Sequence, residues 1–135
     1  MSAKTLTHPN ELRVPLNALE AGLRRAKAML AGGLPHKERV RLEAEKKRLE
    51  SEIVRAMSVW RDGAIRYYTE RFKDARKRMT VAQERLDAAI QQSQRNMSVQ
   101  SYDAVEKARD FVHSFISQIA ECRARMTEIG ATLTD

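Results

Sequence analysis

The chain has 135 residues, of which 32% are charged and only 5% aromatic, and its formal net charge is +7. Five Gly and three Pro give it few places to reverse direction, so the composition is typical of long helices with a narrow apolar seam and not of a compact globule. A single cysteine, Cys122, excludes an intramolecular disulfide.

The N-terminal residues predict neither secretion nor membrane insertion. Residues 1–10 lack the apolar core of a signal peptide, and no stretch has the apolar length of a transmembrane helix. We therefore expect a cytoplasmic protein without membrane contact. Residues 1–10 read as a flexible tail on a single helical domain that spans residues 1–135.

The first predicted helix covers about residues 15–31. Pro15 suits the first turn of a helix, where its missing N–H is not needed, and Gly32 and Gly33 suit the end of one. Between them, apolar residues recur at spacings of three and four, the pattern of a coiled-coil seam: Leu16, Leu19, Leu23, Ala26 and Leu30.

A second helix is predicted over about residues 36–95. Its apolar seam changes register by two residues near Asp62 and Gly63, which indicates either a break or a change of the facing helix. We favour one continuous helix whose first half faces the first helix and whose second half faces the third. The seam before the change is Leu42, Leu49, Ile53, Ala56, Trp60 and Tyr67, and the seam after it includes Tyr68, Phe72, Ala75, Met79, Ala82 and Leu86.

The third helix is predicted over about residues 99–133, and either Ser98 or Ser101 can cap its start. Phe111 and Ile116 flank its seam and widen the apolar face. The seam itself has spacings of three and four throughout: Val105, Ala108, Val112, Phe115, Ile119, Cys122, Met126 and Ile129. The short connection to the second helix predicts that the two are antiparallel neighbours.

The expected fold is therefore all-α. It is an elongated antiparallel coiled-coil hairpin of helices about 36–95 and 99–133, with the short helix of about residues 15–31 folded back on it, a three-helix arrangement.

The sequence predicts a protein without catalytic, metal or cofactor sites and without a small-molecule substrate. His8, His36 and His113 lie on different elements at no metal-ligand spacing, and Cys122 falls in the seam, where burial suppresses reactivity. The carboxylates between residues 43 and 52 alternate with Lys and Arg, as on a solvated helix face.

The leading functional hypothesis is a small helical adaptor or inhibitor that acts through protein–protein interaction, with homodimerisation as one form. Apolar side chains at the register change and beside the third seam are the candidate partner-binding residues. They are Trp60, Ile65, Tyr67, Phe111 and Ile116.

Two alternatives remain. One is a nucleic-acid-binding protein whose basic stripe over residues 66–78 contacts phosphates, although such a run is also common on a solvated helix face. Its candidate residues are Arg66, Arg71, Lys73, Arg76, Lys77 and Arg78. The other is a structural or assembly component of a phage or secretion apparatus.

Overall fold

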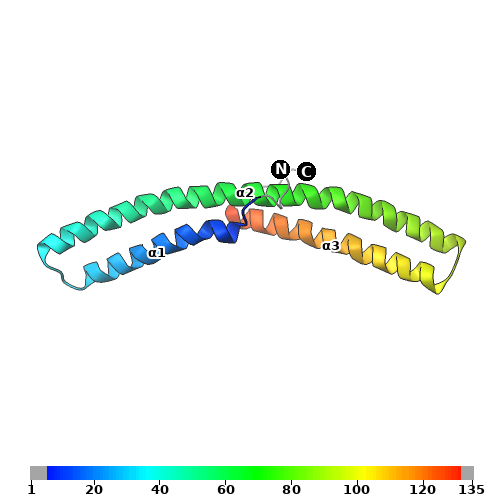
Figure 1. Cartoon of the computed structure of the whole chain (residues 1–135), viewed down its shortest axis with the longest axis horizontal. Helices are drawn as coiled ribbons and strands as arrows, with labels where there is room; N and C mark the ends of the chain where they lie inside the picture. Colours follow the sequence, from blue (N-terminus) through cyan, green and yellow to red (C-terminus); the bar gives the residue numbers. More distant parts are fainter. Residues whose placement is uncertain (1–5, 132–135) are drawn as a thin grey trace. The chain divides into compact units, whose positions relative to one another are not determined.

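The computed structural model describes residues 6–131 and consists, over that range, of three helices without a strand. The helices are α1 (Pro9–Ala31), α2 (His36–Arg95) and α3 (Val99–Ile129) (Figure 1). The predicted all-α class is confirmed, and α2 has the bounds that the sequence pattern predicts.

Helix α1 begins six residues before the predicted start at Pro15. The ring Nδ1 of His8 accepts a hydrogen bond from the backbone N–H of Asn10 at 3.0 Å, so His8 acts as the N-cap. Pro9 follows in the first turn, where the absence of an N–H costs nothing. Part of the predicted tail is thus helical, and its residues 1–5 lie outside the described residues.

Helix α2 runs without interruption through Gly63, as predicted. The helix does not break there, and the glycine allows a close approach. A Cβ atom built on Gly63 would lie within 3.0 Å of Cδ1 of Leu12 in α1. The missing side chain therefore makes room for Leu12.

Both ends of α3 are closed by recognisable caps. The hydroxyl of Ser98 accepts a hydrogen bond from the N–H of Ser101 at 3.2 Å, and the hydroxyl of Ser101 accepts one from the N–H of Ser98 at 3.1 Å. Ser98 is therefore the cap. At the other end Gly130 has φ of 80°, a conformation that glycine adopts without strain, and the helix stops at Ile129 instead of the predicted 133.

Contacts divide the chain into two compact units that share α2. The N-terminal unit is Thr7–Arg66, and the C-terminal unit comprises Leu6 and the described residues from Tyr67 onwards. The prediction of one domain over residues 1–135 stays a prediction.

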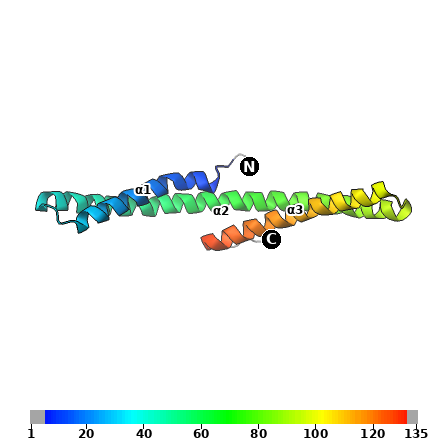
Figure 2. The ribbon, with the colours of Figure 1, turned by 90° about the horizontal axis from the view of Figure 1, so that it is seen from below.

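In the N-terminal unit, α1 packs on the first part of α2 (Figures 1 and 2). Leu16 and Ala26 of α1 and Leu49 of α2 are buried. Gly22 lies opposite Leu49, and Leu12 lies opposite Gly63. Residues later in α1 therefore contact residues earlier in α2.

In the C-terminal unit, α3 packs on the second part of α2 (Figures 1 and 2). One buried cluster joins Phe72 and Ala75 to Ile119 and Cys122. A second cluster joins Ala82 to Val112 and Phe115. Residues later in α2 therefore contact residues earlier in α3. The alanines of α2 leave room for the larger side chains of α3, which lets the two helices pack closely.

Candidate protein-binding groove

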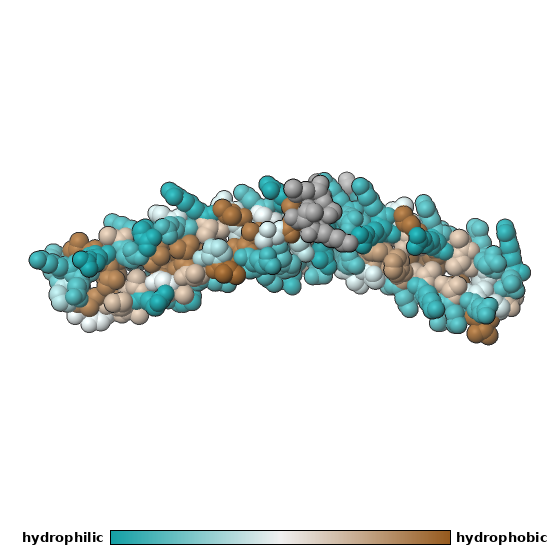
Figure 3. Space-filling model, viewed as in Figure 1, coloured by the Kyte–Doolittle hydropathy of each residue, from teal (hydrophilic) through white to brown (hydrophobic). Residues whose placement is uncertain are grey.

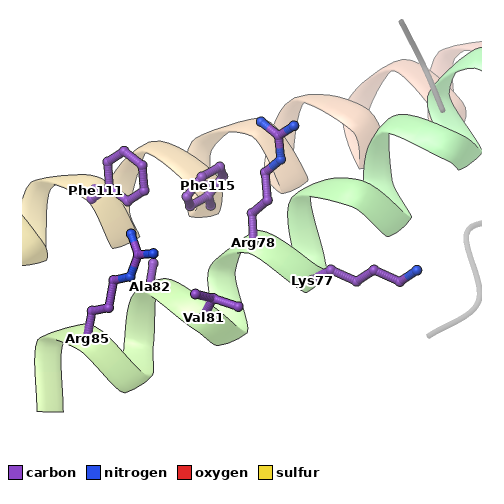
Figure 4. A pocket seen from close by; sticks show the side chains of 7 residues that line it. All are labelled: Lys77, Arg78, Val81, Ala82, Arg85, Phe111 and Phe115. Atoms are coloured by element: carbon purple, nitrogen blue, oxygen red, sulfur yellow. The ribbon is translucent and has the colours of Figure 1, made fainter. Parts of the chain in front are cut away.

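A groove of about 380 Å³ runs between α2 and α3 of the C-terminal unit (Figure 4). Seven side chains line it: Lys77, Arg78, Val81, Ala82, Arg85, Phe111 and Phe115. The residues from α2 include Arg78, Val81, Ala82 and Arg85, whose spacings of three, one and three place them on one face of a helix. The space-filling view shows apolar atoms between hydrophilic ones over these two helices (Figure 3).

Two phenylalanine rings form the α3 wall of the groove. The rings of Phe111 and Phe115 meet edge to face, with centroids 5.1 Å apart and planes at 89°. Phe115 is only 5% exposed and belongs to the core, whereas Phe111 is 52% exposed. The groove therefore presents an aromatic side chain whose position is supported by a buried neighbour.

Every charged side chain that lines the groove is a cation. Arg78 pairs through Nε with Oδ2 of Asp74 at 3.4 Å. Among the residues that the structure describes, Lys77 and Arg85 make no ion pair. In Figure 4 the side chains of Arg78 and Arg85 extend from α2 towards α3, while Lys77 points away. The groove thus combines an apolar floor with two guanidinium groups at its rim.

A second groove of about 530 Å³ lies in the same unit and shares no residue with the first. Its lining is Arg76, Met79, Ile116, Ile119, Ala120 and Arg123. The guanidinium carbons of Arg76 and Arg123 lie 5.7 and 5.5 Å from the ring centroid of Phe72, which is buried beneath them. These arginines are therefore partly engaged in covering the core.

The structure separates two residues that the sequence predicts to act together. Phe111 lines the first groove and Ile116 the second. Five residues along a helix correspond to a rotation of about 140° from one side chain to the other. A single partner helix lying in one groove therefore contacts only one of them.

The other three candidate partner-binding residues are less exposed than expected. The guanidinium of Arg13 lies 4.9 Å from the ring centroid of Trp60, which is half-buried, as is Ile65. Tyr67 is only 8% exposed, and its hydroxyl accepts a hydrogen bond from Nη1 of Arg71 at 3.2 Å. The ring of Tyr67 is thus part of the core, and its role in partner binding stays a prediction.

The residues of the predicted basic stripe differ in their surroundings. Arg71 is half-buried against Tyr67, and Nζ of Lys73 pairs with Glu70 at 3.9 Å. Arg76 lines the second groove. The remaining members are Lys77 and Arg78, which line the first groove, and Arg66, which is exposed in the N-terminal unit.

Val81, Arg85 and Arg123 line the two grooves but were not among the predicted site residues. Arg85 lies outside the basic run, and only its spacing of seven from Arg78 could have linked the two. Arg123 comes from α3, and no local pattern connects it to Arg76. Arg123 lies near Arg76 because two helices meet, which a single helical pattern does not encode.

The thiol and the strongly paired charged groups of the chain lie in surroundings that indicate structural roles. Cys122 is fully buried, and burial raises the pKa of its thiol. The guanidinium of Arg48 bonds to Glu45 and Glu52 on the surface of α2, and this hydrogen bonding lowers the pKa of Glu45. Over residues 6–131 no three His, Cys, Asp or Glu side chains gather in a way that could hold a metal ion.

Within the same range no helix combines the length and apolar character needed to cross a membrane. No family model matches the sequence, and no curated protein or solved structure is significantly similar to it.

Proposed function

We propose that this protein is a non-enzymatic helical adaptor or inhibitor that binds another protein through the groove between α2 and α3. The observation that carries the proposal is the exposure of Phe111 beside buried Phe115 in a groove rimmed by Arg78 and Arg85. Aromatic residues and arginines are enriched among the residues that dominate binding energy at protein interfaces. A half-exposed aromatic ring supported by a buried one is already ordered, so binding costs little side-chain entropy.

We further propose that each unit is an antiparallel coiled-coil hairpin. The reversed contact order of Leu12 and Gly22 with Gly63 and Leu49 supports this for the N-terminal unit. The two buried clusters of α2 and α3 support it for the C-terminal unit. Such a hairpin has no enclosed pocket and offers its outer faces and grooves for contact.

Site-specific photo-crosslinking in the native host tests the proposed binding surface. A photoreactive phenylalanine analogue replaces Phe111, which preserves the size and aromatic character of the side chain. We expect one predominant crosslinked protein that is identified by mass spectrometry.

Tyr102 provides a matched control, since it is also an aromatic residue of α3, is 51% exposed and does not line the groove. The same analogue at position 102 should not crosslink to that protein. Equal crosslinking from both positions, or none from position 111, would contradict the proposal.

A further inference from the structure

We infer that the partner segment in this groove is an acidic amphipathic helix, with carboxylates about two turns apart on either side of its apolar residues. The inference rests on the proposed function and adds the chemistry of the partner.

The charges of the groove select an acidic partner. Lys77, Arg78 and Arg85 line it, and no carboxylate does. Arg85 has no ion-pair partner among the described residues, so a partner carboxylate there would not have to displace an existing one. Arg78 already pairs through Nε with Asp74, so a second carboxylate would bind the Nη atoms of its guanidinium. An Arg–carboxylate pair is stronger than a neutral hydrogen bond, and its bidentate geometry adds specificity. A basic partner would instead meet like charges.

The spacing of the two arginines favours a helix as the bound segment. Arg78 and Arg85 are seven residues apart on α2, which corresponds to about 10.5 Å along the helix axis. A second helix lying along the groove repeats at the same interval, so carboxylates seven residues apart reach both arginines. Apolar residues between them, at spacings of three and four, then face Val81 and Phe111.

The surroundings of the rings argue against a nucleic acid in this groove. Base stacking on successive bases needs several open aromatic faces, but Phe115 is buried, so Phe111 is the one exposed ring among the residues that line the groove. The floor formed by Val81 and Ala82 offers no hydrogen-bond donor to phosphate or base. Apolar side chains of a protein helix complement that floor.

A comparison with the groove of the N-terminal unit shows that the charge pattern is not general. That groove is also apolar, with Leu19, Met29 and Leu42 in its lining, but its charged residues are Arg25 and Glu45. Opposite signs there give no preference for an acidic or a basic segment. A purely cationic lining is therefore a property of the C-terminal unit. Its second groove also has only cations, Arg76 and Arg123, but both of these lie over the ring of Phe72.

A displayed library of amphipathic helical peptides, random in charge, tests the inference on the full-length protein. Peptides retained by the wild-type protein should carry Asp or Glu seven residues apart, with apolar residues between them. Enrichment of neutral or basic peptides would overturn the inference.

Substitutions then assign the enriched peptides to the groove. We expect Arg85→Glu and Phe111→Ala each to weaken binding by about tenfold or more. Arg109→Glu and Tyr102→Ala change exposed residues of α3 outside the groove lining and should change binding by less than about twofold. Circular dichroism of each variant establishes that α-helix content is unchanged. Equal weakening by Arg85→Glu and Arg109→Glu would overturn the inference.

Two further measurements test whether a nucleic acid or a second copy of the chain occupies the groove. Binding of an oligonucleotide that Arg85→Glu abolishes, without retention of acidic peptides, would show a nucleic-acid site and overturn the inference. A dimer in light scattering that Phe111→Ala dissociates would show that a second copy fills the groove, and would also overturn it. If acidic peptides fail while crosslinking from position 111 succeeds, the inference fails and the proposed function stands.

Discussion

Leu12 of α1 occupies the space that a side chain at Gly63 of α2 would need. The contact explains why a glycine is compatible with the middle of a helix, where it is otherwise unfavourable relative to alanine by about 1 kcal/mol. Gly22 of α1 is different, because a Cβ there would meet Leu49 at an ordinary 3.7 Å.

The two glycines therefore predict different outcomes for the same substitution. Gly22→Ala should raise the free energy of unfolding by up to about 1 kcal/mol, because it improves helix propensity without a clash. Gly63→Ala should raise the free energy of unfolding by less than Gly22→Ala does, since Leu12 must move. Urea denaturation followed by circular dichroism measures both values.

A double-mutant cycle isolates the contact. In a Leu12→Ala background the obstacle at position 63 is absent, so Gly63→Ala should become stabilising by about 1 kcal/mol. The same effect of Gly63→Ala in both backgrounds would contradict the close approach of the two residues.

The cap of α3 predicts a second stability change. Ser98→Ala removes the acceptor for the N–H of Ser101 and should lower the free energy of unfolding by about 1 kcal/mol. Ser114→Ala, at an exposed position inside α3, is the control and should be neutral or slightly stabilising. Equal losses from both substitutions would show that the cap contributes nothing specific.

The two groove phenylalanines should differ in their effect on stability. Phe115→Ala removes a buried ring and should cost about 3–5 kcal/mol of unfolding free energy. Phe111→Ala removes a half-exposed ring and should cost less than about half of that. Thermal denaturation of the two variants measures the difference. A larger loss from Phe111→Ala would mean that its ring serves the core and not a partner.

Alkaline pH should destabilise the C-terminal unit. Burial raises the pKa of Cys122 above its ordinary 9.0 and that of Tyr68 above its ordinary 10.0. The folded state therefore holds these protons more tightly than the unfolded state does. From about pH 9 upwards the unfolded chain ionises first, so the free energy of unfolding falls until the pH has passed the folded pKa values.

Tyr68→Phe removes one of the two ionising groups and should make the alkaline loss smaller. Tyr102→Phe, at an exposed tyrosine of α3, should leave the loss as in the wild type. Urea denaturation at several pH values up to the alkaline range measures the three profiles. Identical profiles for Tyr68→Phe and the wild type would contradict the role of Tyr68.

The division of the basic run predicts weak nucleic-acid binding. Since Arg71 is half-buried and Arg76 and Arg78 line different grooves, we expect that the six cations do not all meet one phosphate backbone together. Fluorescence anisotropy with a labelled oligonucleotide should therefore show a shallow salt dependence, because few counterions are released. A steep dependence that the triple substitution of Lys73, Arg76 and Lys77 to Glu removes would favour the nucleic-acid alternative.

Local sequence patterns are sufficient to predict which segments of this chain are helical. Apolar residues at spacings of three and four predict the seam of α3, and the structure buries Val112, Phe115, Ile119 and Cys122 from that seam. Glycine and proline between residues 31 and 36 predict the break between α1 and α2. These features involve residues close together in the sequence, so they can be recognised from the sequence alone.

The ends of the helices were only partly predictable. His8 caps α1 through its ring nitrogen. Ser, Thr, Asp and Asn are the usual residues in this role, so the sequence predicts a start of the helix later than the observed one. Gly130 ends α3 before the predicted position, although a glycine just after the last apolar residue of a seam commonly marks the end of a helix.

Which groove each side chain beside a seam lines depends on how the helices pack. Helical periodicity gives the direction of Phe111 and Ile116 around α3, but it does not state which residues of α2 stand beside each one. That depends on the rotation of the two helices about their axes when their cores interlock. The packing of α2 on α3 places Arg85 and Phe111 in one groove and Arg76 and Ile116 in the other. In the buried clusters between the helices, Ala75 packs with Ile119 and Cys122, and Ala82 with Val112 and Phe115.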